Sequence, residues 1–182
     1  MMHPALLDIL EQDYGDSFAE PSEFAILRAP PPAGVQRDDF PSLTVKCDHI
    51  LPLCEQLKQD SRLRFNFLSD IGGVDWLPQT PRFEVIYHLY SIPFKYRLRL
   101  KCKLNEGEAI ASVVSVWKTA NWHEREAYDM FGIVFENHPD LRRIYLWDEF
   151  EGFPLRKDFP LRGYRDEYNP YGEEPGLDRG PG

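Results

Sequence analysis

The segment from Phe83 to Leu104, FEVIYHLYSIPFKYRLRLKCKL, decides the fold because it contains the clearest hairpin pattern in the chain. Both halves, Phe83–Tyr90 and Lys95–Leu104, are rich in strand-forming residues, and the SIPF sequence between them is typical of a turn. We therefore predict two antiparallel strands. If the turn is centred on Pro93 and Phe94, three pairs lie opposite each other: Glu84 with Lys103, His88 with Arg99, and Tyr90 with Arg97.

The second half of this hairpin alternates strictly between cations and apolar residues. Because successive side chains of a strand point to opposite faces, the cations form one row at intervals of about 7 Å. The row consists of Lys95, Arg97, Arg99, Lys101 and Lys103. We interpret it either as a solvated outer face of the sheet or as a docking strand for an acidic protein partner or an RNA backbone.

Upstream of the hairpin, we predict two helices and three strands. Residues 4–13 form a short amphipathic helix, and a second helix begins after Asp48 as its N-cap and runs to about residue 59. Strands are predicted at 23–28, 42–47 and 65–76, with a proline-rich loop between the first two. Gly72 and Gly73 are expected to end the third strand in a bulge or turn.

Downstream of the hairpin, residues 112–131 predict one helix or two short ones, and Gly132 is placed to end the helical segment. The segment from 140 to 160 contains turn residues throughout. Together these elements predict an α+β fold: a mixed sheet with helices packed on one face and an irregular extended C-terminal arm. We place one domain at residues 1–162 and an extended tail at 163–182, which we expect to become ordered on partner proteins.

Composition excludes several classes of function. The 182 residues suffice for one domain with its own core, and 30 acidic against 21 basic residues give a net charge of −9, which argues against nucleic-acid binding. No apolar run reaches the roughly 18 residues that a membrane-spanning helix needs, and the N-terminal stretch lacks the pattern of a secretory signal. The three cysteines, Cys47, Cys54 and Cys102, are scattered, so we expect structural thiols in a reducing compartment.

The segment from residue 123 to 158 contains the candidate chemistry. His123 and Glu124 begin a zinc-protease motif, but Ala127 stands where the second histidine is required. Glu124 and Glu126 are about 200° apart around a helix and cannot share one ligand. No phosphate loop or nucleophile motif is present, so we predict no catalytic, cofactor-binding or metal-binding residues. The dense alternation of acids and arginines is typical of an interface or of a network that orders irregular backbone.

Two stretches carry a specific family resemblance. The sequence ANWHEREAYDMFGIVFENHPDLRRIYL at 120–146, followed by EGFPLRKDFPLRGY at 151–164, closely resembles the 30-kDa or C-type subunit family of the proton-pumping NADH:quinone oxidoreductase, respiratory complex I. With the hairpin included, the resemblance covers roughly residues 82–163. The family's signature positions fall on Glu124, Arg125, Glu126, Asp129, His138, Pro139, Leu141, Arg142, Arg143, Pro154, Leu155, Arg156, Lys157, Asp158 and Pro160.

The resemblance implies a cofactor-free subunit of the peripheral arm of this translocase. Its partners would be the other complex I subunits, chiefly the D-type subunit at the quinone site and neighbouring iron–sulfur subunits, while FMN, iron–sulfur clusters and quinone would belong to those partners. It would lie at the cytoplasmic face of the bacterial inner membrane and meet the membrane only through the complex.

Two alternatives remain open. The chain is also similar to the corresponding subunit of a ferredoxin-linked quinone reductase or of a membrane-bound nickel–iron hydrogenase, and no residue distinguishes the electron donor. A different class is an autonomous carboxylate-dependent hydrolase that uses Glu124, Glu126, Asp129 and His138.

Overall fold

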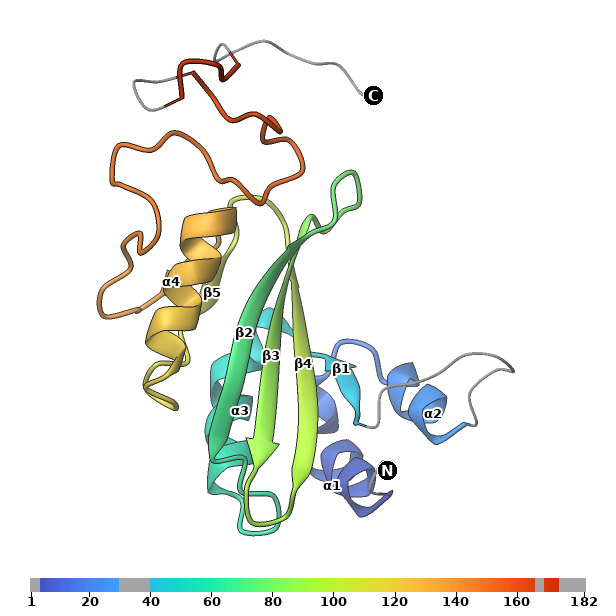
Figure 1. Cartoon of the computed structure of the whole chain (residues 1–182). Coiled ribbons are helices and arrows are strands. Elements are labelled where there is room, and N and C mark those ends of the chain that lie inside the picture. Colours follow the sequence, from blue (N-terminus) through green and yellow to red (C-terminus); the bar gives the residue numbers. More distant parts are fainter. Residues whose placement is uncertain (1–3, 30–39, 166–168, 174–182) are drawn as a thin grey trace.

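A four-stranded mixed sheet forms the centre of the computed structural model, which describes residues 4–29, 40–165 and 169–173 (Figure 1). The strand order is β1-β4-β3-β2. The strands are β1 (Ser42–Thr44), β2 (Phe67–Asp75), β3 (Phe83–Ser91) and β4 (Tyr96–Leu104). β2, β3 and β4 pair in antiparallel fashion and β1 pairs with β4 in parallel. A second sheet pairs β5 (Ala109–Ala111) with β6 (Val134–Glu136). The predicted α+β class with a mixed sheet is confirmed.

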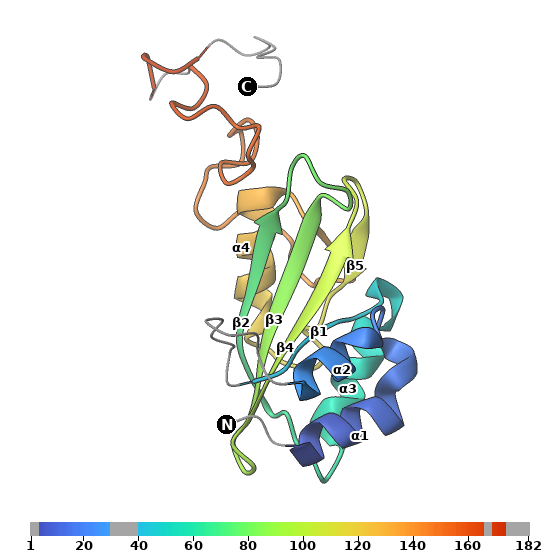
Figure 2. The ribbon, with the colours of Figure 1, turned by 90° about the vertical axis from the view of Figure 1, so that its right-hand side faces the viewer.

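Four α-helices accompany the sheet: α1 (Pro4–Tyr14), α2 (Ser22–Arg28), α3 (Ile50–Gln59) and α4 (Ala120–Phe131). In Figure 1, α3 lies behind the sheet, α4 lies along its β2 edge and α2 lies beside β1. Figure 2 shows α1, α2 and α3 near one end of the sheet and α4 near the other, with the C-terminal arm extending beyond α4. None of the helices in the described ranges is long and apolar enough to span a bilayer.

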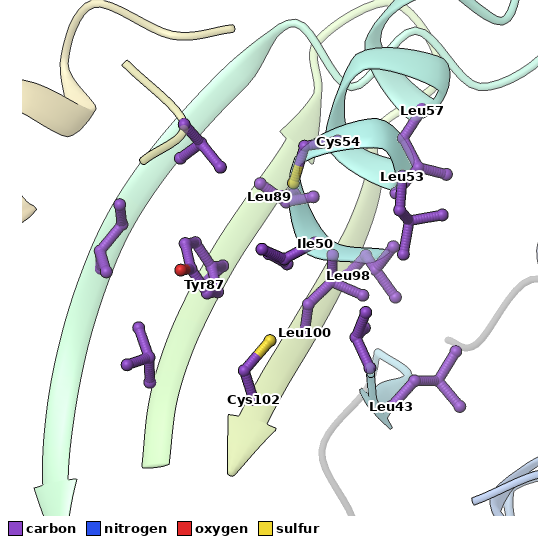
Figure 3. Packing of buried hydrophobic residues seen from close by; sticks show 14 of the residues in the cluster. Leu43, Ile50, Leu53, Cys54, Leu57, Tyr87, Leu89, Leu98, Leu100 and Cys102 are labelled. Carbon is purple, nitrogen blue, oxygen red and sulfur yellow. The ribbon is translucent and has the colours of Figure 1, made fainter. Parts of the chain in front are cut away.

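The main core lies between α3 and the sheet (Figure 3). Alternate residues of β3 and β4 point toward the helix, as the period of a strand requires. The residues that meet there are at most 2% exposed: Ile50, Leu53, Cys54, Leu57, Tyr87, Leu89, Leu98, Leu100 and Cys102. On the opposite face, all three predicted pairs of the hairpin are in register, namely Glu84 with Lys103, His88 with Arg99 and Tyr90 with Arg97.

Three predictions for the segment before β2 are wrong. Residues 23–28 form helix α2, because the segment has no alternation and buries only Phe24 completely, with Leu27 partly buried one turn later. The strand predicted at 42–47 ends at Thr44, and Cys47 to His49 form a 3-10 turn, so Asp48 lies inside that turn and His49 occupies the N-cap position of α3.

Downstream, the predicted helix is shorter than expected. Residues 112–119 form turns, and α4 begins only at Ala120, because the amide of Val113 and the hydroxyl of Ser112 bind the Glu124 carboxylate instead of continuing a helix. Gly132 ends α4 in the left-handed conformation with φ of 72°, as predicted. Lys95 has a φ of 57° and lies in the hairpin turn, so four of the five predicted cations lie on the strand.

The glycine pair does not end β2, contrary to the prediction. Gly72 and Gly73 pair regularly with Ile86 and Val85, and the register shift lies near the other end of the strand, between Leu68 and Asp70. A Cβ atom on Gly73 would lie 2.7 Å from Cδ2 of Phe131, the last residue of α4, whereas one on Gly72 would meet nothing within 4 Å. The glycine at position 73 therefore allows α4 to approach the sheet.

We expect Gly73→Ala to lower the free energy of unfolding by about 1–3 kcal/mol, because the added methyl group displaces the Phe131 ring. Gly72→Ala is the matched control on the neighbouring residue and should change stability by less than about 1 kcal/mol. Urea unfolding of both variants measures the difference. Equal losses would show that the approach of α4 to β2 does not require glycine.

The three cysteines are free thiols, as expected from their scattered positions. Cys54 and Cys102 are buried in the core, and burial raises the pKa of Cys54. Cys47 is partly exposed and its thiol donates to the carbonyl oxygen of Lys103 at 3.0 Å.

Candidate functional site

Helix α4 and the irregular segment after β6 form the candidate site. Helical geometry places the three acids of α4 in different surroundings. The side chains of Glu124 and Asp129 are fully buried, whereas Glu126 is exposed. Two of the three acids of α4, Glu124 and Asp129, are therefore held in buried polar sites, and the third, Glu126, faces outward.

Glu124 fixes the loop that precedes α4. Its carboxylate accepts hydrogen bonds from the Ser112 hydroxyl at 2.6 Å and from the Val113 amide at 2.7 Å. No ion pair with lysine or arginine offsets its burial within the described chain, and burial raises its pKa to about 7, although these two hydrogen bonds act in the opposite direction. The nearest basic side chain is His138, whose Nε2 lies 3.9 Å from Glu124 Oε2.

His138 ties the chain after β6 to the start of α4. Its Nε2 lies 3.1 Å from the carbonyl oxygen of Asn121, and its Nδ1 accepts from the amide of Asp140 at 3.0 Å. This pattern fits the neutral imidazole with its proton on Nε2. Burial is the main reason why the pKa of His138 lies below its ordinary value, so the ring is neutral at pH 7. His138 therefore serves as a structural link.

Asp129 and Arg143 form the central clamp of the C-terminal arm, which is the irregular segment that follows β6. One carboxylate oxygen of Asp129 accepts from three consecutive amides, those of Ile144, Tyr145 and Leu146, at 2.7–3.2 Å. The other oxygen accepts from Arg143 Nη1 at 2.7 Å. Burial alone would raise the pKa of Asp129, but the amides and the guanidinium outweigh it and hold that pKa below its ordinary value.

Arg143 and Arg125 both bind main-chain carbonyl groups. Arg143 Nη2 donates to the carbonyl oxygens of Phe150 and Gly152 at 3.1 and 3.0 Å. Arg125 donates to the carbonyl oxygens of Arg142 and Arg143, and its guanidinium lies 4.9 Å from the centre of the Trp122 ring. These contacts order a segment that has no helix or strand of its own.

A second anchor holds the arm against the end of β2 and the start of β3. Arg82 is 8% exposed and pairs with Asp75, Glu106 and Asp158 at 2.8–2.9 Å. Asp75 also accepts from the amide of Lys157 at 2.9 Å. Burial would raise the pKa of Asp75, but Arg82 and the amides of Lys157 and Leu77 hold it at about 2.

Arg156 completes this anchor. Its Nε donates to the carbonyl oxygen of Phe131 at 2.7 Å, which satisfies one of the last carbonyls of α4, and its Nη1 pairs with Glu106 at 2.8 Å. The guanidinium lies 4.5 Å from the ring centre of Phe153 and 5.0 Å from that of Phe83. Arg156 therefore joins the arm, α4 and β3.

The remaining signature residues lie on or near the surface. Pro139 is exposed, Arg142 pairs with Asp140 at 3.0 Å at an exposed position, and Pro154 is partly buried. The Lys157 ammonium group donates to the carbonyl oxygen of Leu77 at 3.2 Å. Leu155 is 54% exposed, and Leu141 and Pro160 are partly buried.

The cationic strand is partly neutralised within the chain. Lys101 pairs with Glu23 at 3.3 Å and Lys103 with Glu20 at 2.9 Å, so the region around α2 supplies the acids. Arg97 lies over the Tyr90 ring and Arg99 over Phe40, beside a hollow of about 270 Å³ that Asp70 and His88 also line. Docking of a partner on this strand stays a prediction. Because Lys101 and Lys103 are already paired, the surface left for a partner lies mainly at the Arg97 end of the strand.

The hydrolase alternative requires the acids of α4 to converge, and the structure separates them. Glu124 and Asp129 are each occupied by their own hydrogen bonds, Glu126 points outward, and His138 donates to a carbonyl. Across the described ranges, no three histidine, cysteine or acidic side chains are grouped so that they could bind a metal ion.

Sequence reasoning missed the socket of the second anchor. Asp75 is the last residue of β2, Arg82 directly precedes β3 and Glu106 lies in the turn after β4, so the three residues are scattered along the chain and form no motif. The hairpin between β2 and β3 provides a signal, because pairing these two strands places Asp75 opposite Phe83, next to Arg82.

Comparisons with known proteins agree with this architecture. Residues 43–165 match the family described as the 30-kDa subunit of respiratory-chain NADH dehydrogenase. A C-type subunit of the NADH-quinone oxidoreductase of Rhizobium etli is 61% identical over 127 residues, which is 70% of this chain and 68% of that protein. The corresponding C-type subunit of Rhizobium meliloti is 59% identical over 133 residues, 73% of each chain.

A solved structure shares the fold. A chain of the membrane-bound sulfane sulfur reductase, an archaeal respiratory membrane complex, aligns with a TM-score of 0.60 at 25% identity, and the match covers 70% of this chain and 75% of that one. The family match spans most of the sheet, α4 and both anchors of the arm. This chain therefore belongs to the family of the 30-kDa, C-type subunits of the respiratory-chain NADH dehydrogenase.

Proposed function

We propose that this chain is a scaffolding subunit in the peripheral arm of a proton-translocating NADH:quinone oxidoreductase. It acts without a cofactor of its own, and electrons pass from NADH to quinone through FMN and iron–sulfur clusters in partner subunits. Its partners are chiefly the D-type subunit at the quinone site and the neighbouring iron–sulfur subunits. It lies at the cytoplasmic face of the bacterial inner membrane, as a peripheral protein attached through the complex.

The proposal rests on the way in which the C-terminal arm is attached to the rest of the chain. Residues 142–158 are fixed by buried charges to α4 and to the end of the sheet, while large apolar side chains of the same arm remain outside. Tyr145, Trp147, Leu155 and Leu161 are between 43% and 101% exposed. A rigid path that presents aromatic and aliphatic side chains to solvent is typical of an interface that another chain covers.

The first test is to recover the tagged chain from gently solubilised membranes and to identify its partners by mass spectrometry, with assays for flavin and iron. Recovery of membrane, iron–sulfur and NADH-oxidising subunits is expected. Recovery of hydrogenase or ferredoxin-linked subunits would replace NADH as the donor. Recovery of the chain alone would contradict a scaffolding role.

We expect Arg143→Ala to reduce the amount of assembled complex at least fivefold in membranes, because it removes the guanidinium that holds Asp129 and the carbonyl groups of Phe150 and Gly152. Native gel electrophoresis measures assembly. Arg142→Ala is the matched control, since the neighbouring Arg142 is 69% exposed and its side chain binds only Asp140 among the described residues. Full assembly of the Arg143 variant would contradict the proposed role of the arm.

A further inference from the structure

One exposed carboxylate of α4 is left without a cation. Within the described ranges, the only side-chain partner of Glu126 is the Tyr145 hydroxyl at 3.4 Å, and no lysine or arginine there forms a salt bridge with it. Its neighbour Arg125 is turned into the protein and binds two main-chain carbonyl groups. The other acids of the signature have shorter contacts inside the molecule: Glu124 binds Ser112 and Val113, Asp129 binds Arg143, and Asp158 pairs with Arg82. Glu126, with only its long contact to Tyr145, is therefore the acid that remains for a partner.

The surroundings of Glu126 are aromatic and fixed in place. Trp122 lies one helical turn before Glu126 on the same face of α4 and is 62% exposed. The Arg125 guanidinium supports one side of the Trp122 ring. Tyr145 is 65% exposed, and its main-chain amide is bound to the buried Asp129. The negative charge of Glu126 is the largest cause that raises the pKa of Tyr145.

The surface continues along the helix. Met130 follows Glu126 by one further turn and is partly buried, and its carbonyl oxygen accepts from the amide of Leu155 at 3.1 Å. Leu155 is 54% exposed. The stripe of Trp122, Tyr145, Met130 and Leu155 is therefore apolar and contains one carboxylate at its centre, an arrangement suited to the core of an interface rather than to its polar rim.

We propose that this stripe, defined as Trp122, Glu126, Met130, Tyr145 and Leu155, binds a segment of a neighbouring subunit that presents one arginine among apolar side chains. A guanidinium group can pair with the carboxylate of Glu126 in two parallel hydrogen bonds and stack on an aromatic ring at the same time. A lysine ammonium group cannot do both equally well. The inference rests on the proposed function and specifies the chemistry of one partner.

Photocrosslinking in the assembled complex tests the proposal. The full chain carries p-benzoylphenylalanine in place of Trp122, and the complex is purified from membranes through a tag on this chain. After irradiation, mass spectrometry is expected to find a crosslink to a neighbouring subunit within a few residues of an arginine. A crosslinked segment without an arginine, or no crosslink in a complex that co-purifies normally, would overturn the inference and leave the scaffolding role intact. Failure of any subunit to co-purify with the unsubstituted chain would overturn both.

A charge exchange tests the carboxylate itself. Glu126→Gln keeps the size of the side chain and is expected to reduce retention of this chain in the complex about tenfold in a salt wash, since it removes one charge-assisted pair. Glu55→Gln, at an exposed position of α3, is the control and should not change retention. Glu126→Arg should lose retention, and a glutamate in place of the crosslinked arginine should restore it. Unchanged retention of Glu126→Gln, or no recovery in the exchanged pair, would contradict the proposal.

Discussion

Replacing Asp129 by asparagine is expected to lower the free energy of unfolding by about 3–5 kcal/mol, although the two side chains have nearly the same shape. The carboxylate is fully buried and serves four donors, three amides and one guanidinium. An asparagine offers one acceptor oxygen and turns an N–H group toward the remaining donors, so at least one of them loses its bond inside the protein. Arg143 would also lose its only ionic partner in the described structure.

Two measurements check this expectation. Urea unfolding gives the change in stability, and hydrogen exchange should show lost protection at the amides of residues 144–146, while the amides of β3 stay protected. Asp140→Asn is the matched control, because Asp140 pairs with Arg142 where both side chains are more than half exposed, and it should cost less than about 1 kcal/mol. An Asp129→Asn variant with native stability and protected arm amides would show that the clamp does not order the arm.

The second large effect concerns pH and Glu124. Burial raises the pKa of this carboxyl from its ordinary value of 4.5 to about 7. Between these two values the unfolded chain releases a proton that the folded chain keeps, so the stability contributed by Glu124 is fully present below pH 4.5 and falls as pH rises to about 7. A difference of roughly 2.5 pKa units corresponds to a loss of about 3 kcal/mol.

Glu124→Gln should remove this dependence, because glutamine resembles the protonated acid and can still bind Ser112 and Val113. The difference in free energy of unfolding between the variant and the native chain is expected to shift by about 2.5 kcal/mol in favour of the variant between about pH 5 and pH 8. Urea unfolding across this range measures it, and Glu55→Gln, at an exposed position, should follow the native chain at every pH. Parallel curves for Glu124→Gln and the native chain would mean that the buried carboxyl titrates normally.

How far the sequence predicts this molecule depends on how local the signal is. The hairpin from Phe83 to Leu104 was predictable in register, because the position of its turn at Pro93 and Phe94 sets the pairing and the alternation of its second strand excludes a slip of one residue. Helix α2 was not, because seven residues with one fully buried side chain carry no clear period. Gly73 had the propensity of a strand end, but its contact with Phe131 comes from a helix far along the chain, and packing outweighs propensity there.

The candidate site shows the same limit. Family resemblance identified the acids of α4, but the sequence could not predict their different surroundings. Glu124 is buried without an arginine or lysine partner, Asp129 forms a clamp with Arg143, and Glu126 lies at the surface. The helix period places Glu124 and Glu126 on different sides, yet it does not say what covers either one. The anchor of Asp75, Arg82 and Glu106 depends on the arm folding back over the end of the sheet, a contact between residues up to 82 positions apart.

Most of the hydrogen bonds that fix the arm are made to its main chain. Asp129 and Asp75 bind four of its amides, and Arg125 and Arg143 bind four of its carbonyl oxygens. These groups are present whatever the side chain, except that proline lacks the donor. The path of the arm is thus independent of which side chains it exposes to solvent. Point substitutions at Tyr145, Trp147 or Leu155 are therefore expected to change the exposed surface of the arm without changing its path.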